Sequence, residues 1–361
     1  YEVLKQNLPP SVVLTPEGDF ESFDIPFVMN QYKKAHLSID ETKIQEYFPV
    51  DATIQALFKI YESFFDITFE KYPQTEGLWH TDVTVLAVRN KADNVLLGHV
   101  VLDLFPRDGK YTHACHIGTV PAVLPGSVGN PDSTVALPAL SIVLANFPKA
   151  SGDRPALFLH SDVETFFHEF GHAIHWVMGR CETLTVSGTR VKRDFVELPS
   201  QMLEEWMWQP SILALVSQHF ESKKPLDEEL IKSKIKSRNA FSGRDGLRQL
   251  QFALTSLTLF SPEFGSQDEA SMDSTAVLVD IQKRVMGHVK YNDETRFQCA
   301  FGHLMGYGAS YYGYMWSEVF AKDVFHYIKE KEGLLDKTMG RRYVEHIIGP
   351  AGSVDPNVLL E

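Results

Sequence analysis

Apolar residues recur at helical spacing along residues 161–180, SDVETFFHEFGHAIHWVMGR. The apolar positions form one wide face, which predicts a largely buried helix: Val163, Phe166, Phe167, Phe170, Ile174 and Val177. Ser161 followed by Glu164 matches a capping box and predicts where the helix begins. Gly179 stands where a helix commonly stops.

Helical spacing also dominates the chain after residue 180. Six segments separated by breakers such as Pro210, Pro225 and Gly265 are predicted to be helices: 194–208, 211–220, 226–237, 247–260, 270–289 and 311–331. Earlier in the chain, two short helical patterns between residues 25 and 48 precede a helix at 52–69 with Asp51 as its N-cap. Residues 1–22 are weakly patterned and predict an irregular lead-in.

Residues 73–150 differ, because short β-type runs replace the helical spacing. Runs at 83–88 and 95–105 flank a turn from Asn90 to Asn94, which predicts a hairpin. LSIVLANF at 140–147 predicts a third strand shortly before the 161–180 helix. Two segments look too irregular for regular structure: 106–116 and 121–131.

These patterns predict a mainly α fold with a small β-sheet (α+β). One catalytic domain is expected to span residues 1–361. It would comprise a helical lead-in, a region of sheet and loops, and a helical region, in that order: 1–72, 73–150 and 151–361.

Composition and charge narrow the classes of partner and compartment. With 361 residues, 44% of them hydrophobic, the chain can bury a large core. A net charge of −13 disfavours nucleic acids and anionic membrane surfaces as partners. Cys115, Cys181 and Cys299 are too few and too widely spaced for a disulfide framework or a Cys-based zinc cluster.

The cysteine usage predicts a reducing compartment, which is the cytoplasm or an organellar matrix. No run of about 18 apolar residues occurs, so no membrane span is expected. The chain begins at Tyr1 without a secretory signal pattern, and we expect that start to be a processing or cloning boundary.

The candidate chemistry lies in the first helix, as His168-Glu169-Phe170-Gly171-His172. Side chains four residues apart stack on one helix face, so His168 and His172 can hold one Zn²⁺ ion together. Glu169 projects beside them as a general base for a water molecule activated by the metal. Two His and a Glu in a buried helix would be costly without a partner, which favours a metal site over a polar helix face.

Catalytic zinc usually has three protein ligands, and Glu197 is the best third candidate. It precedes Pro199 near the start of a helix that Asp194 is predicted to cap. By itself Glu197 would be a surface carboxylate, but its apolar neighbours predict a buried flank where an unpaired charge is costly. A structural metal site is disfavoured, because such sites normally use four ligands and prefer Cys.

Two further features each allow two interpretations. Glu164 lies one turn before His168 and could accept from an imidazole N–H, or it could serve only the capping box. The strand at 140–147 could pair with an extended peptide substrate, or it could be a plain buried strand.

Several motifs together resemble the zinc oligopeptidase family of thimet oligopeptidase, neurolysin and bacterial oligopeptidase A. The similar segments lie between about residues 30 and 356: LDLFPRDGKYTHA, LANF, DVETFFHEFGHAIH, SGTRVKRDFVELPSQMLEEW and FGHLMGYGASYYGYMWSEVFAKDVF. The resemblance implies a zincin-like metallopeptidase catalytic region. It also implies that His168, His172 and Glu197 are the zinc ligands and that Glu169 is the catalytic base.

The resemblance also gives a role to an aromatic cluster near the C-terminus. On spacing alone, Tyr311 and Tyr314 would be core packing in a helix that follows a glycine-containing loop. The family's matching residues face the zinc, which implies that His303, Tyr311 and Tyr314 stabilise the oxyanion. Tyr307, Gly306 and, before the zinc helix, Ala145 are predicted to contact substrate.

The function implied is zinc-dependent hydrolysis of internal peptide bonds in short peptides, with one Zn²⁺ per chain. Family members are longer, and the helical N-terminal half that forms the opposite wall of their channel has no counterpart in these residues. The alternative is therefore a zinc- or peptide-binding fragment that does not cleave. A missing N-terminal half is the other expected partner, besides short peptides.

Overall fold

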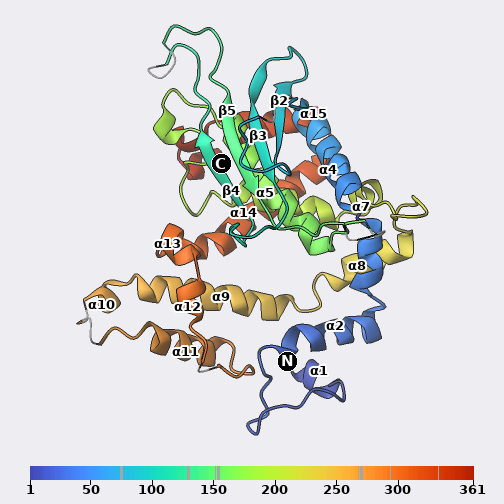
Figure 1. The fold of residues 1–361 in the computed structure, drawn as a ribbon. Helices are drawn as coiled ribbons and strands as arrows, with labels where there is room; N and C mark the ends of the chain where they lie inside the picture. The colour runs from blue at the N-terminus through green and yellow to red at the C-terminus, as the bar shows by residue number, and fades with distance from the viewer. Residues whose placement is uncertain are drawn as a thin grey trace. The chain divides into compact units, whose positions relative to one another are not determined.

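The computed structural model describes residues 1–73, 76–127, 131–150, 152, 155–266, 268, 271–292, 294–331 and 333–361 (Figure 1). The chain divides into two compact units. The first consists of Tyr1–Asp40 and Glu228–Trp316, and the second of Glu41–Asp227 and Ser317–Glu361. Each unit combines segments that are far apart in the sequence, whereas the prediction divided the chain into consecutive regions.

A five-stranded sheet in the order β1-β2-β3-β5-β4 lies in the second unit. Its strands, drawn in cyan and green in Figure 1, are β1 (Ile67–Lys71), β2 (Thr84–Asn90), β3 (Leu96–Asp103), β4 (Cys115–Val120) and β5 (Ala139–Leu144). β1, β2 and β3 are antiparallel neighbours, β5 runs parallel to β3, and β4 pairs antiparallel with β5 at the sheet edge. The predicted mainly α fold with one small sheet is confirmed.

The predicted hairpin forms β2 and β3, and the predicted third strand forms β5. Two strands were missed. The helix expected at 52–69 is α4 (Val50–Phe65), which ends because Asp66 adopts a left-handed backbone with φ 55°, and the residues that follow form β1. Only the first two residues of β4 lie in a segment that was expected to be irregular, and the rest was not assigned. This partly exposed edge strand lacks the alternation of buried and exposed positions that marks a strand.

The helix predicted at 161–180 is α5 (His160–Met178), with Gly179 as its C-cap as expected. It packs against β3, β4 and β5. The predicted capping box of Ser161 and Glu164 is wrong. The helix begins one residue earlier, and Asp162 accepts the backbone N–H of Leu159 at 2.8 Å.

Aromatic side chains form much of the core beneath α5. Phe64 of α4, Phe167 and Phe170 of α5, and Trp206 are all fully buried. The hydroxyl of Tyr61 in α4 donates to the carbonyl of Phe167 at 2.9 Å, which ties the two helices together. The helix predicted at 194–208 is shorter than expected: α6 (Leu198–Glu204) runs into the 3-10 turn η3 (Glu205–Trp208).

The remaining elements of the second unit are α3 (Glu41–Ile44), η1 (Gln45–Tyr47), η2 (Leu184–Val186), α7 (Pro210–Val216), α15 (Lys337–Tyr343), η6 (Val344–Ile348), η7 (Ala351–Ser353) and α16 (Pro356–Leu359). The unit boundary after Trp316 falls within α14 (Gly313–Lys331). α15 packs closely on α4, because a Cβ on Gly340 would lie only 1.6 Å from the carbonyl oxygen of Phe64.

The first unit contains α1 (Glu2–Gln6), α2 (Asp24–Leu37), α8 (Glu228–Ser237), α9 (Ser242–Leu259), α10 (Pro262–Gly265), α11 (Ser274–Val285), α12 (Phe297–Ala300), α13 (His303–Tyr307) and η5 (Ser310–Tyr312). One of its apolar clusters is built on Leu4, Phe20, Ile25 and Val28, and another on Ala253, Phe301, Leu304 and Tyr311. In the described parts of both units, no helix is long and apolar enough to cross a membrane.

Candidate metal centre

Three side chains converge in the second unit at the middle of α5. The Nε2 atoms of His168 and His172 are 3.1 Å apart. The Oε2 atom of Glu197 lies 3.2 Å from the first and 3.0 Å from the second. Among the described residues, these three are the only group of His, Cys, Asp or Glu with spacing suited to a metal ion.

Glu197 reaches the site because α6 approaches α5 closely. A Cβ on Gly171 would lie 3.0 Å from Leu203 and 3.1 Å from the Cα of Ser200, so no larger residue fits easily there. Glu197 is the N-cap of α6, and its carboxylate is buried with 1% of its surface exposed. The hydroxyl of Ser200 donates to the Glu197 carbonyl at 3.0 Å and lies 3.3 Å from its Oε2 atom, which orients the carboxylate.

The three donor groups fit a divalent cation such as Zn²⁺. Tetrahedral ligands about 2.0–2.1 Å from zinc lie about 3.3 Å from one another, close to the observed spacings. The carboxylates of Glu197 and Glu204 outweigh the effect of burial and hold the pKa of His168 well above its usual range. His172 and His168 likewise outweigh burial and hold the pKa of Glu197 well below its usual range. The cluster therefore favours an added positive charge.

The carboxylate behind His168 is Glu204, which the sequence analysis did not identify. Its Oε1 atom lies 2.5 Å from Nδ1 of His168. Such a contact sets the tautomer, because a proton held on Nδ1 leaves the Nε2 lone pair facing the site. Glu204 is the seventh residue after Glu197, two helical turns along α6, so this spacing could have suggested it.

Glu164 was predicted either to accept from a ligand imidazole or to serve only the capping box, and in the structure it contacts other groups. It accepts from the indole N–H of Trp208, and its other oxygen lies 3.3 Å from Nδ1 of His160. His160 is fully buried at the start of α5, and its Nε2 atom lies 3.1 Å from the Met207 carbonyl. Glu164 thus helps anchor the helix, while Glu204 orients the imidazole of His168.

Glu169, the predicted base, lies between the ligands in sequence and is partly exposed. Burial and the negative charge of Glu169 together raise the pKa of the Cys115 thiol at the start of β4. The partial exposure of Glu169 leaves its carboxylate accessible to water.

Substrate pairing to β5 is not supported, because that strand is flanked by β3 and β4 along its length. Ala145 just beyond it is 1% exposed and donates its N–H to the carbonyl of Asp103. Its own carbonyl accepts from Lys110 Nζ at 2.6 Å. The Ala145 side chain is therefore enclosed, its contact with substrate stays a prediction, and β4 lies at the edge of the sheet next to β5.

A buried polar network anchors the loop between β3 and β4. Asp103 accepts two hydrogen bonds from Arg107, at 2.7 and 2.8 Å, and one from the indole of Trp79 at 2.9 Å. Lys110 pairs with the same carboxylate at 2.9 Å. Asp103, Arg107 and Lys110 come from LDLFPRDGK, so this motif of the family resemblance fixes the path of the chain into β4.

Two further histidines near the ligands were not predicted. His116 of β4 has its ring 6.0 Å from that of His172, and its Nε2 atom is 2.9 Å from the Ser141 hydroxyl. His175 is fully buried one turn after His172, and neither of its ring nitrogens has a partner among the described residues. Burial and the nearby His172 lower the pKa of His175 to about 3, so it is neutral at pH 7.

The predicted oxyanion residues form one aromatic cluster within the first unit. Neighbouring rings of His303, Tyr307, Tyr311 and Tyr314 lie 4.8 to 5.8 Å apart, centre to centre. The hydroxyl of Tyr311 donates to Oε1 of Gln249 at 3.1 Å. A Cβ on Gly306, within α13, would meet no atom within 4 Å. The structure thus brings these residues together, while their roles in catalysis stay predictions.

Comparisons with known proteins give relatives along nearly the whole chain. Saccharolysin of Saccharomyces cerevisiae is 34% identical over 349 residues, covering 94% of this chain and 48% of saccharolysin. Thimet-like oligopeptidase of Dictyostelium discoideum is 34% identical, covering 96% and 50%. Oligopeptidase A of Escherichia coli is 33% identical, covering 95% and 49%. The chain spans about half the length of these curated relatives.

The sequence profile of peptidase family M3 matches residues 4–361. The resemblance inferred from the motifs is thereby confirmed, and the chain belongs to peptidase family M3.

Proposed function

We propose that the chain hydrolyses internal peptide bonds of short peptides, with one Zn²⁺ ion held by His168, His172 and Glu197. The observation that carries the proposal is the convergence of these three groups on the helix that bears Glu169. Relatives that match nearly the whole chain are named as oligopeptidases, which supports short peptides as the substrate class.

The metal, when bound, supplies a Lewis acid that acidifies water and polarises a carbonyl. Glu169 takes the proton from the attacking water and later delivers it to the leaving amine. Glu204 holds His168 in the tautomer that presents Nε2 to the site. Ser200 and the buried flank of α6 hold the Glu197 carboxylate.

The aromatic cluster supplies the remaining groups in this proposal. His303, Tyr311 and Tyr314 donate hydrogen bonds to the oxyanion that forms on the scissile carbonyl. Tyr307 and Gly306 contact the peptide. An extended peptide substrate pairs with the outer edge of β4 in this proposal. It does not pair with β5, because β5 already has a neighbouring strand on each side.

An internally quenched fluorescent peptide tests the proposal. Cleavage should stop on treatment with a chelator and return with added Zn²⁺, at one ion per chain by elemental analysis. Glu169→Gln should keep the metal and lose cleavage by about 10²- to 10⁴-fold, the usual contribution of a general base. Glu182→Gln, at an exposed loop position, is the matched control.

Two outcomes would contradict the proposal. Cleavage by Glu169→Gln at the parent rate would exclude Glu169 as the base. Binding of zinc and peptide without any cleavage would instead support the non-catalytic alternative.

We place this activity in the cytoplasm or an organellar matrix. The three cysteines Cys115, Cys181 and Cys299 are all free thiols, which supports a reducing compartment.

A further inference from the structure

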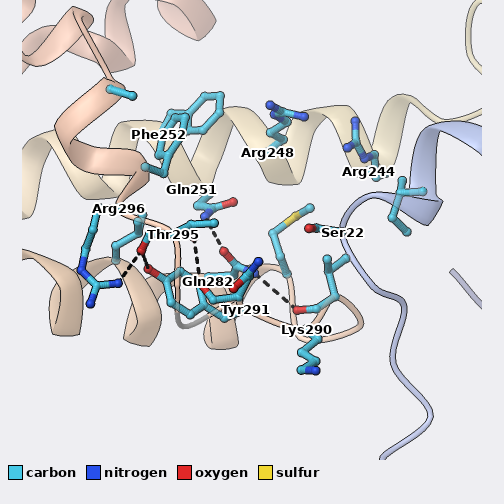
Figure 2. A pocket seen from close by; sticks show the side chains of 17 residues that line it. Ser22, Arg244, Arg248, Gln251, Phe252, Gln282, Lys290, Tyr291, Thr295 and Arg296 are labelled. Carbon is cyan, nitrogen blue, oxygen red and sulfur yellow. Dashed lines mark hydrogen bonds between the residues drawn. The ribbon is translucent and has the colours of Figure 1, made fainter. Parts of the chain in front are cut away.

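The first unit contains a second candidate site, a cavity of about 610 Å³. Its walls come from α9, from α11 and the segment that follows it, and from Ser22 and Ile25 near the start of α2 (Figure 2). The volume lies within the range of about 300–1,000 Å³ typical of small-molecule sites. No role in the proposed hydrolysis falls on any residue that lines it.

The lining of this cavity is basic although the chain as a whole carries a net charge of −13. Four of its side chains are cationic, and the described lining residues include no Asp or Glu: Arg244, Arg248, Lys290 and Arg296. Arg244 and Arg248 are one turn apart on α9, so they extend from neighbouring positions on the helix (Figure 2). Lys290 and Arg296 come from the segment after α11.

The two arginines of α9 are incompletely neutralised. Arg244 pairs with Asp245 at 2.8 Å, but its Nε atom is buried with no hydrogen-bond partner among the described residues. Arg248 makes no hydrogen bond or ion pair with a described residue, and its guanidinium lies 5.3 Å from the Phe252 ring centre. Burial and the charge of Arg244 both lower the pKa of Arg248. An anion between the two guanidiniums would relieve both effects.

The remaining polar lining is neutral. Gln251 is buried and donates to Gln282 at 3.3 Å, and Gln282 donates to the Val289 carbonyl at 3.4 Å (Figure 2). Planar guanidinium groups bind phosphate oxygens through paired hydrogen bonds, and Arg is preferred over Lys for this reason. A single inorganic phosphate would fill only a small part of the cavity, which leaves room for an organic group.

We propose that this cavity binds a small organic phosphate, with the phosphate groups on Arg244 and Arg248 and the organic part between α9 and α11. Charge and size support this class together. A neutral ligand would leave the charge of Arg248 and the buried Nε atom of Arg244 without a partner among the described residues, and a bare ion would leave most of the space open.

A ligand in this cavity would also contact side chains that hold Tyr311 in place. Phe252 lines the cavity and meets the Tyr311 ring edge-on at 5.6 Å. Gln249 and Ser256, on the same helix, hold the Tyr311 hydroxyl and backbone N–H at 3.1 and 3.3 Å. We therefore expect an occupied cavity to change the rate of peptide hydrolysis, and this expectation alone rests on the proposed function.

Calorimetric titration of the chain with ATP, tripolyphosphate and adenosine tests the binding. ATP and tripolyphosphate should bind at one site per chain, and more weakly as salt is raised, whereas adenosine should bind far more weakly or not at all. A tighter constant for ATP than for tripolyphosphate would place the organic group in the cavity. The same titrations after chelator treatment separate cavity binding from capture of the metal by the phosphates.

Arg244→Gln and Arg248→Gln should each weaken ATP roughly tenfold or more, the usual loss for one charged hydrogen-bond partner. Arg248→Lys keeps the charge and should weaken binding by a smaller factor. Arg284→Gln is the matched control, because Arg284 is exposed on α11 and pairs with Asp280. Circular dichroism should show the parent fold for each variant.

Three results would overturn the proposal: no saturable binding of ATP or tripolyphosphate, unchanged affinity in both arginine variants, or equal affinity for adenosine and ATP. Because binding is measured without peptide, failure here leaves the proposed peptidase activity untouched. An inactive chain would equally leave the binding result intact.

Discussion

The metal centre and the aromatic cluster near the C-terminus differ in what holds them together. At the metal centre, polar atoms approach to 3.0–3.2 Å, and Glu197 is almost fully buried. In the aromatic cluster, rings of His303, Tyr307, Tyr311 and Tyr314 pack at 4.8–5.8 Å. The first arrangement brings together polar groups that could share a cation, whereas the second consists of packed aromatic rings.

Because of this difference, the two regions are not equally strong evidence for a function. Buried carboxylate and imidazole groups are costly unless something pairs them, so their convergence by itself indicates a ligand. Aromatic packing stabilises a fold whether or not a ligand is present. The catalytic role of the tyrosines therefore has to be tested by substitution, and the four tests below run from the largest expected effect to the smallest.

Glu197→Gln should have the largest effect. Removing the only charged group among the three candidate ligands should cost most of the bound zinc and, with it, essentially all peptide cleavage. Elemental analysis and the quenched-peptide assay measure the two losses. A variant that keeps one zinc per chain would show that Glu197 is not a ligand. The convergence of the three side chains would then not indicate a metal site.

Tyr314→Phe removes a hydroxyl while keeping the ring. If this hydroxyl stabilises the oxyanion, kcat should fall about 10²- to 10³-fold with zinc content unchanged. Tyr312→Phe, at an exposed neighbouring position, should leave kcat at the parent value. Equal activity in both variants would assign Tyr314 to packing alone.

Gly171→Ala tests how Glu197 is brought to the site. The new methyl would press on Leu203 and on the backbone of Ser200, so α6 must shift and zinc affinity should fall roughly tenfold or more, as when supporting groups are disturbed. Gly246→Ala in α9 is the control, because its Cβ would meet nothing within 4 Å. Parent affinity in Gly171→Ala would mean that close helix approach does not position the carboxylate.

His175→Leu should change the pH dependence of stability. The unfolded chain binds a proton on this residue near pH 6.5, but the folded chain binds one only near its pKa of about 3. The free energy of unfolding therefore decreases as the pH falls from about 6.5 toward 3. Between pH 7 and pH 5 the decrease is about 2 kcal/mol.

Urea unfolding of the metal-free chain at the two pH values measures this loss. The leucine variant should lose about 2 kcal/mol less than the parent on acidification. His346→Gln, at an exposed site, should behave as the parent. An unchanged pH dependence in His175→Leu would show that His175 is not held neutral by burial.

Local sequence patterns were sufficient to predict much of the region around the candidate metal centre. The spacing of His168 and His172, the apolar face around them and the stop at Gly179 are properties of one helix, so a short window of sequence contains them. Glu197 could be proposed because its apolar neighbours made an isolated surface charge improbable. The hairpin of β2 and β3 followed from two β-type runs around a short turn.

Errors arose where a side chain had a choice of partners. Glu164 lies one turn before His168 on α5, whereas Glu204 lies on α6. Only the packing of α6 on α5 decides that Glu204 contacts Nδ1 of His168. The mostly apolar sequence of β5 suits a strand at an edge or inside a sheet, and only its pairing with both β3 and β4 shows that it lies inside.

By itself, therefore, the sequence determined the family, the two histidines on one helix face and a third candidate ligand at the start of a second helix. The tertiary structure decided which carboxylate supports His168, which strand ends the sheet, and how the arginines of α9 come to line a cavity with α11. The physical reason is that helical periodicity is a local property. Which side chains contact one another depends instead on which distant segments pack together. A periodic pattern within one segment does not contain that information.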